Sequence, residues 1–108
     1  MVSNSLSGYN LPFPTGNTLS ITNDNFYHYF GVNAATTINT NLPANNATFY
    51  LINNTASDAV TITFSDNETA TNTAELTIPA SKYTLCAVIH DLTVTVLTTF
   101  QARIVASF

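Results

Sequence analysis

Apolar and polar residues alternate along several short runs of this chain. In residues 60–64, 75–78 and 93–96, apolar residues alternate with threonine. A period of two places one set of side chains on a buried face of a β-strand and the hydroxyl groups on the opposite face. These runs therefore predict half-buried β-strands.

Turn-forming residues separate these runs from further strand-like segments. Asn, Asp, Ser and Pro fill the connecting stretches, and no segment has a sustained helical period. About nine short strands at this spacing are typical of a sandwich or barrel. We expect an antiparallel all-β fold, a β-sandwich of jelly-roll-like type. The predicted strands are 18–22, 26–30, 36–40, 48–53, 60–64, 75–78, 83–90, 93–97 and 100–106.

The chain of 108 residues has the size of one domain. Residues 1–17 show no sustained period and contain two of the four prolines, which predicts an extended N-terminal arm before a single sandwich domain at 18–108. One interpretation of the arm is a loose tail. The other is docking onto a neighbouring subunit, because Tyr9, Leu11 and Phe13 are apolar side chains that a solvated tail does not need.

Four aromatic residues lie within residues 26–30, in the sequence FYHYF. On a strand they would project from both faces, so both faces need a partner surface. Burial in the sandwich combined with a subunit contact is one interpretation, and an exposed aromatic platform for a sugar is the other. The first interpretation, extended to the last predicted strand, gives the expected subunit contacts: Phe26, Tyr27, Tyr29, Phe30, Phe100, Ile104 and Phe108.

Charged residues make up only 7% of the chain, and 14 Asn and 19 Thr supply most of the polar side chains instead. The net charge is −4. Two basic residues cannot supply the phosphate contacts on which nucleic-acid affinity depends, so nucleic acid and anionic membranes are excluded as partners. The longest mostly apolar run, 83–97, is too short to span a membrane. The first residues lack the features of a secretory signal, so we expect synthesis in a cytoplasm.

Few residues are suited to catalysis or metal binding. His28 near Asp24 and His90 beside Asp91 are the His–carboxylate neighbours, and neither accompanies a nucleophile motif or zinc spacing. Three acidic residues that could bind calcium, Asp58, Asp66 and Glu68, flank the strand 60–64, which holds Asp58 and Asp66 apart. We therefore assign no catalytic, cofactor-binding or metal-binding residue and expect a protein that is not an enzyme.

Cys86 is the single cysteine, so it has no intramolecular disulfide partner. It is either a buried structural thiol or a reactive or intersubunit cysteine.

Four segments occur in a characteristic order: Asn41-Leu42-Pro43, FYLINNT at 49–55, VTITF at 60–64 and LTIPASKYTL at 76–85. With this order, residues 36–99 resemble a module of phage tail-fibre and other virion surface proteins. The resemblance implies a virion component without enzymatic activity, commonly trimeric and made in the host cytoplasm.

Since 108 residues provide no long shaft, we expect a capsid-decorating or minor structural protein, or a short head fibre, located in the virion. Its partners would be itself, as a homotrimer, and a major capsid or other virion protein to which Tyr9, Leu11 and Phe13 anchor it. The alternative is a lectin-like carbohydrate-binding adhesion module for a host-surface glycan. It would use Tyr27, Tyr29, Tyr50 or Tyr83 as stacking surfaces.

Overall fold

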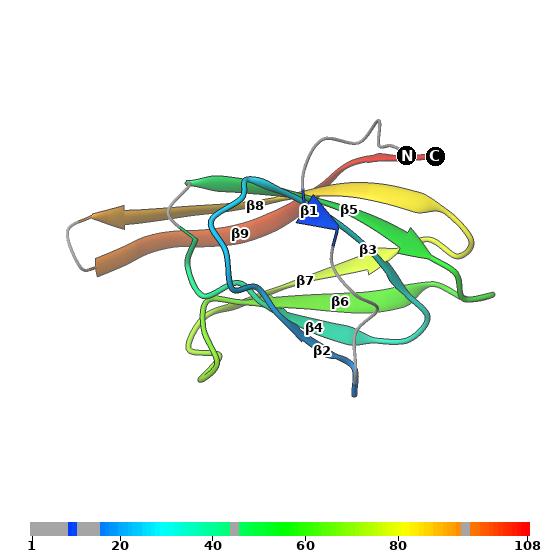
Figure 1. Cartoon of the computed structure of the whole chain (residues 1–108), viewed down its shortest axis with the longest axis horizontal. Coiled ribbons are helices and arrows are strands. Elements are labelled where there is room, and N and C mark those ends of the chain that lie inside the picture. The colour runs from blue at the N-terminus through cyan, green and yellow to red at the C-terminus, as the bar shows by residue number, and fades with distance from the viewer. Residues whose placement is uncertain (1–8, 11–15, 44–45, 94–95) are drawn as a thin grey trace.

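Nine strands and no helix are formed by the residues that the computed structural model describes, which are 9–10, 16–43, 46–93 and 96–108. The strands lie in two sheets that face each other across a shared core (Figure 1). Sheet A has the order β1-β3-β5-β8-β9, and sheet B has the order β2-β4-β6-β7. The expected all-β sandwich is confirmed. The bounds are β1 Tyr9–Asn10, β2 Thr18–Ser20, β3 Tyr27–Val32, β4 Thr36–Asn39, β5 Ala47–Asn54, β6 Val60–Ser65, β7 Thr73–Ile78, β8 Tyr83–Thr93 and β9 Val96–Ser107.

The first six strands alternate between the two sheets. Strands β1, β3 and β5 lie in sheet A, whereas β2, β4 and β6 lie in sheet B, so each strand pairs in parallel with the strand two places further along the chain. The prediction of an antiparallel fold is wrong for this half of the chain, and the jelly-roll connectivity is not confirmed. The reason is that a period of two decides which face a side chain occupies but not which strand lies beside it or in which direction.

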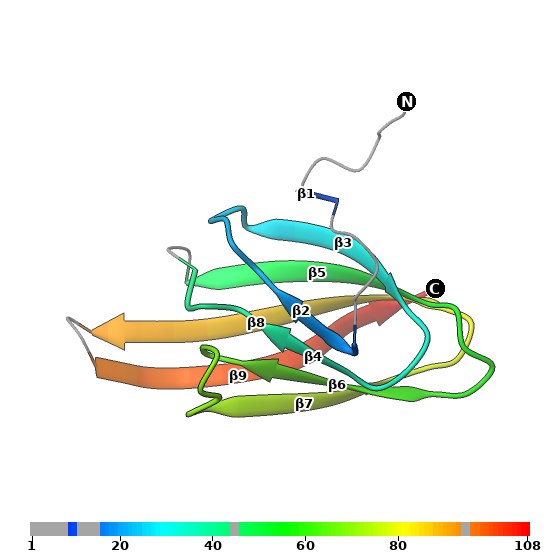
Figure 2. The ribbon, with the colours of Figure 1, turned by 60° about the horizontal axis from the view of Figure 1, so that its bottom comes forward.

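The last three strands follow the expected antiparallel pairing. Strand β7 pairs with β6, and the long β8–β9 hairpin adds to β5 at the other end of sheet A (Figure 2). The segments predicted as separate strands at 93–97 and 100–106 belong to the single strand β9, apart from residues 93–95. The pairing register between β8 and β9 shifts at Thr98 and again at Val105, because β9 has one extra residue at each of these two positions. The Thr98 hydroxyl donates to the Asp91 carbonyl at 3.0 Å at the first shift.

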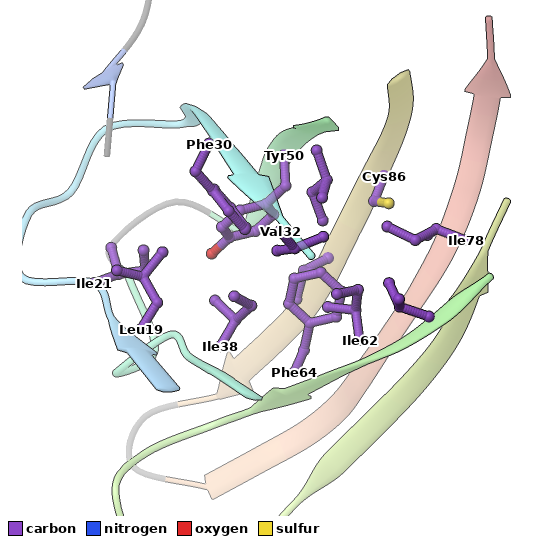
Figure 3. Close-up of a cluster of buried hydrophobic side chains, with 13 residues drawn as sticks. Leu19, Ile21, Phe30, Val32, Ile38, Tyr50, Ile62, Phe64, Ile78 and Cys86 are labelled. Carbon is purple, nitrogen blue, oxygen red and sulfur yellow. The ribbon is translucent and has the colours of Figure 1, made fainter. Parts of the chain in front are cut away.

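Alternate side chains of both sheets form one hydrophobic core (Figure 3). The ring of Tyr50 from sheet A lies 5.1 Å from the ring of Phe64 in sheet B, and Phe30 meets Tyr50 edge-on. Phe30 is only 2% exposed. Its prediction as a subunit contact is therefore wrong, because it lies on the core-facing phase of β3. The buried core consists of Leu19, Ile21, Phe30, Val32, Ile38, Tyr50, Ile52, Val60, Ile62, Phe64, Ile78, Cys86 and Val88.

Part of the predicted N-terminal arm is a strand. Tyr9 and Asn10 form β1, which pairs with His28 and Tyr29 of β3 at the edge of sheet A. Gly16 and Asn17 follow in a turn with positive φ, after which β2 begins in sheet B. The predicted anchoring residues Leu11 and Phe13 lie outside the described residues, as does the side chain of Tyr9.

Candidate self-association surface

The outer face of sheet A, which points away from the core, is apolar in its centre. Because His28, Phe30 and Val32 of β3 face inward, the side chains of Tyr27 and Tyr29 face outward. Each of these two tyrosines begins a row of side chains that are paired across the neighbouring strands of the sheet. One row is Tyr27, Phe49, Ala87 and Arg103, and the other is Tyr29, Leu51, Leu85 and Ala106. We call these eight side chains, with Ile89, Tyr83 and Phe108, the sheet A surface.

Three aromatic rings stack across one end of the sheet A surface. The Tyr83 ring lies 6.4 Å from the Tyr29 ring and 6.4 Å from the Phe108 ring, and the planes differ by 8° and 11°. A hydrogen bond with the Tyr83 side chain raises the pKa of the Tyr29 phenol, and partial burial raises it further. Tyr83 and Phe108 nevertheless remain exposed by 39% and 67%. The stack is thus ordered by its own contacts while much of its area faces solvent.

Strand β9 forms one edge of sheet A and carries exposed apolar side chains. Ile104 and Val105 are both exposed, in the last half of a strand of twelve residues. An edge strand presents backbone N–H and C=O groups without a sheet partner, which favours pairing with another chain. The one-residue shift at Val105 distorts this edge and limits such pairing.

Charges are scarce on the outward positions of sheet A. Among the described residues at those positions in β3, β5, β8 and β9, only Asp91 and Arg103 are charged, and both are exposed. Asp91 lies toward the end of the β8–β9 hairpin, away from the aromatic stack. A partner that covers the sheet A surface would therefore meet apolar and aromatic groups and few ions.

The predicted subunit contacts fall into two groups. Phe26, Tyr27, Tyr29, Ile104 and Phe108 are exposed or half-buried, and Phe26 directly precedes β3.

The other group faces the interior. Phe100 is half-buried and packs against the core from β9, and Phe30 belongs to the core itself. Ile104, although exposed, pairs with the buried Cys86 and lies on the same phase of β9 as Phe100. The sequence-based set therefore combined outward residues with residues on the core-facing phase of their strands.

Tyr83, Leu51 and Leu85 were missed as members of the sheet A surface. Residues 83–90 carry apolar side chains on both phases of the strand, a pattern that indicates a strand with two covered faces. Tyr50, by contrast, is fully buried, so its predicted role as a sugar-stacking surface is wrong. Burial also raises the pKa of its phenol strongly.

The histidine neighbourhoods suggested by the sequence are core positions. His28 is buried and its ring lies 5.3 Å from the Tyr50 ring, and burial lowers its pKa. His90 is buried in sheet A, whereas the next residue, Asp91, is exposed on the other face of β8. Because adjacent strand residues point to opposite faces, Asp91 cannot orient the His90 ring.

The remaining candidates for chemistry are separated or enclosed. Cys86 is buried, and burial raises the pKa of its thiol to about 12, which places it as a structural thiol of the core. Asp58 is exposed before β6, whereas Asp66 is buried after β6 and accepts a hydrogen bond from the Asn72 amide at 2.8 Å. The described residues contain no group of three His, Cys, Asp or Glu side chains placed to hold a metal ion.

No helix in the described part of the chain is long and apolar enough to cross a membrane. Comparison with known proteins found no matching family model, no similar curated protein and no similar solved structure.

Proposed function

We propose that the chain is a structural subunit of a virion, without enzymatic activity, that self-associates through the sheet A surface. The proposed roles are capsid decoration, a minor structural component or a short head fibre, with a homotrimer as the assembled form. The observation that carries self-association is the apolar outer face of sheet A, where the rings of Tyr29, Tyr83 and Phe108 stack and remain partly exposed. The virion assignment rests on the resemblance of residues 36–99 to virion surface modules.

The sheet A surface supports self-association for two physical reasons. Leu51 and Ala87 are covered by their neighbours on this face, but the large apolar side chains of Tyr83 and Phe108 remain exposed, which is unfavourable on a free monomer and favours an interface. Its aromatic residues are also the type enriched in the centres of protein interfaces, where charged residues are depleted. The second copy is the proposed partner because the surface is largely uncharged and is matched by another surface of the same composition.

Amide hydrogen exchange at two protein concentrations tests self-association on this surface. We expect the amides of 83–91 and 100–108 to exchange more slowly at the higher concentration, while the amides of β7, at the edge of the other sheet, exchange at an unchanged rate. Equal protection of both edges at all concentrations would contradict the proposed surface.

Mass spectrometry of purified virus particles tests the virion assignment. Particles produced in a culture whose viral genome encodes this chain should contain its peptides in a constant ratio to the major capsid protein. Their absence from intact particles would contradict the assignment. Anchoring through Tyr9, Leu11 and Phe13 belongs to the same proposal. A chain that lacks residues 1–15 should therefore be absent from the particles.

A further inference from the structure

The two charged side chains on the outer face of sheet A have opposite signs. Arg103 of β9 pairs across the hairpin with Ala87, and Asp91 of β8 pairs with Thr99 on the same face. Both charged side chains are exposed. Because the other described outward positions of sheet A are uncharged, each copy of the chain carries one cation and one anion on this face.

These two charges do not neutralise each other within one copy. Thr99, which lies opposite Asp91, precedes Arg103 by four residues on β9. At about 3.3 Å per residue, the two charged residues are roughly 13 Å apart along the strands, whereas an ion pair needs its nitrogen and oxygen within about 4 Å. Neither charged group forms a hydrogen bond or ion pair with another described residue. Each is therefore available to a partner.

The other charged residues in the described part of the chain lie away from this face. Glu75 belongs to β7, which lies beside β9, but it pairs with Thr63 and points to the outer face of sheet B. Lys82 directly precedes β8, in the turn that follows β7. The remaining acidic residues lie in loops: Asp24, Asp58, Asp66 and Glu68.

A partner that covers the sheet A surface must provide an acceptor for Arg103. The guanidinium stays protonated, and a charge that is removed from water without a partner is unfavourable. Arg103 ends the row that begins at Tyr27, so a partner that covers this row also reaches Arg103. When the partner is a second copy that presents the same face, its outward positions offer one carboxylate, that of Asp91.

Resting on the proposed self-association, we propose that Arg103 of one copy forms an ion pair with Asp91 of the next copy and thereby sets the register of the interface. Apolar surfaces attract one another without directionality, so they leave open how far one copy slides along the other. A charge pair selects one of these arrangements and disfavours those that bring like charges together. One cation and one anion per copy are also the numbers that a closed ring of identical interfaces pairs completely.

Charge reversal in the full chain tests this ion pair, with sedimentation velocity measuring the dissociation constant of the oligomer. Asp91→Arg brings two cations together and Arg103→Asp brings two anions together, so we expect each to raise the dissociation constant by about tenfold or more. The double variant Asp91→Arg/Arg103→Asp restores opposite charges, and its dissociation constant should return to within about threefold of the natural value.

Glu75→Arg is the matched control for Asp91→Arg, because it reverses an exposed carboxylate on the outer face of the other sheet. It should leave the dissociation constant unchanged, and circular dichroism should verify the fold of every variant.

The outcomes separate the ion pair from the self-association on which it rests. If the natural chain associates but the double variant stays as weak as the single variants, the ion pair is overturned while self-association stands. The same holds if neither single variant weakens association, or if Glu75→Arg weakens it as much as Asp91→Arg. A natural chain that is monomeric at all concentrations would overturn self-association itself, and the ion pair with it.

Discussion

The ring of Phe108 stacks on the ring of Tyr83, with centroids 6.4 Å apart and planes 11° apart. The two residues are also joined by a pair of backbone hydrogen bonds, in which the N–H of each donates to the carbonyl of the other at 2.9 and 2.8 Å. Together these contacts hold the end of β9 against β8 and keep an aromatic surface in one arrangement. Self-association would use a surface that is already ordered, which lowers its entropic cost.

A lysine at the centre of the aromatic stack should oppose self-association. Tyr83→Lys places a charge where a covering partner would have to desolvate it, so we expect the dissociation constant of the oligomer to rise by about tenfold or more. Sedimentation velocity over a concentration series measures this change.

Thr77→Lys is the matched control for that variant, because Thr77 is exposed on a strand of the opposite sheet. It adds the same charge and should leave the dissociation constant unchanged. Equal weakening by both variants would indicate a general effect of charge and would argue against the sheet A surface.

Asn54 should be important for stability. It is fully buried at the end of β5, and its amide donates to the carbonyls of Pro79 and Asp58 at 3.0 and 3.2 Å while its Oδ1 accepts from the Ala56 N–H at 2.9 Å. Asn54→Ala leaves these backbone groups without partners and should lower the free energy of unfolding by about 2–4 kcal/mol in urea denaturation.

Asn53→Ala provides the comparison, since Asn53 precedes Asn54 on the opposite face of β5 and is half-buried. We expect it to lower the free energy of unfolding by less than about 1 kcal/mol. If the two variants were equally stable, the buried hydrogen bonds of Asn54 would contribute little.

The buried thiol of Cys86 should make stability fall at alkaline pH. Its pKa is raised from 9.0 to about 12 in the folded chain, so above pH 9 the unfolded state loses the thiol proton while the folded state keeps it. The free energy of unfolding therefore decreases as pH rises through this window, by at most about 1.4 kcal/mol per pH unit. Urea denaturation between about pH 8 and 10 should give a steeper decline for the natural chain than for Cys86→Ala. Parallel declines would show that Cys86 does not titrate on unfolding.

The sequence predicts the faces of the strands better than their order. The period of two places His28 and Phe30 on one face of the strand, and both point into the core. The period of two carries this information because one sheet face is buried. It does not distinguish parallel from antiparallel neighbours, and so it could not reveal that β3 and β5 pair in parallel while β4 lies in the other sheet.

The candidate site was predicted in part for the same reason. Tyr27 and Tyr29 follow from the aromatic run, and Phe108 follows from the apolar end of the sequence. The stacking of Tyr83 between Tyr29 and Phe108 depends on the strand order β3-β5-β8-β9, which local patterning does not contain.

The native mass of the purified chain, measured by light scattering in about 0.15 M and about 1 M sodium chloride, tests self-association most directly. Apolar and aromatic contacts are not weakened by salt screening, so we predict a mass three times that of the 11.6 kDa chain at both salt concentrations. A monomer at all protein concentrations in both salts would contradict the proposal that the sheet A surface joins copies of this chain.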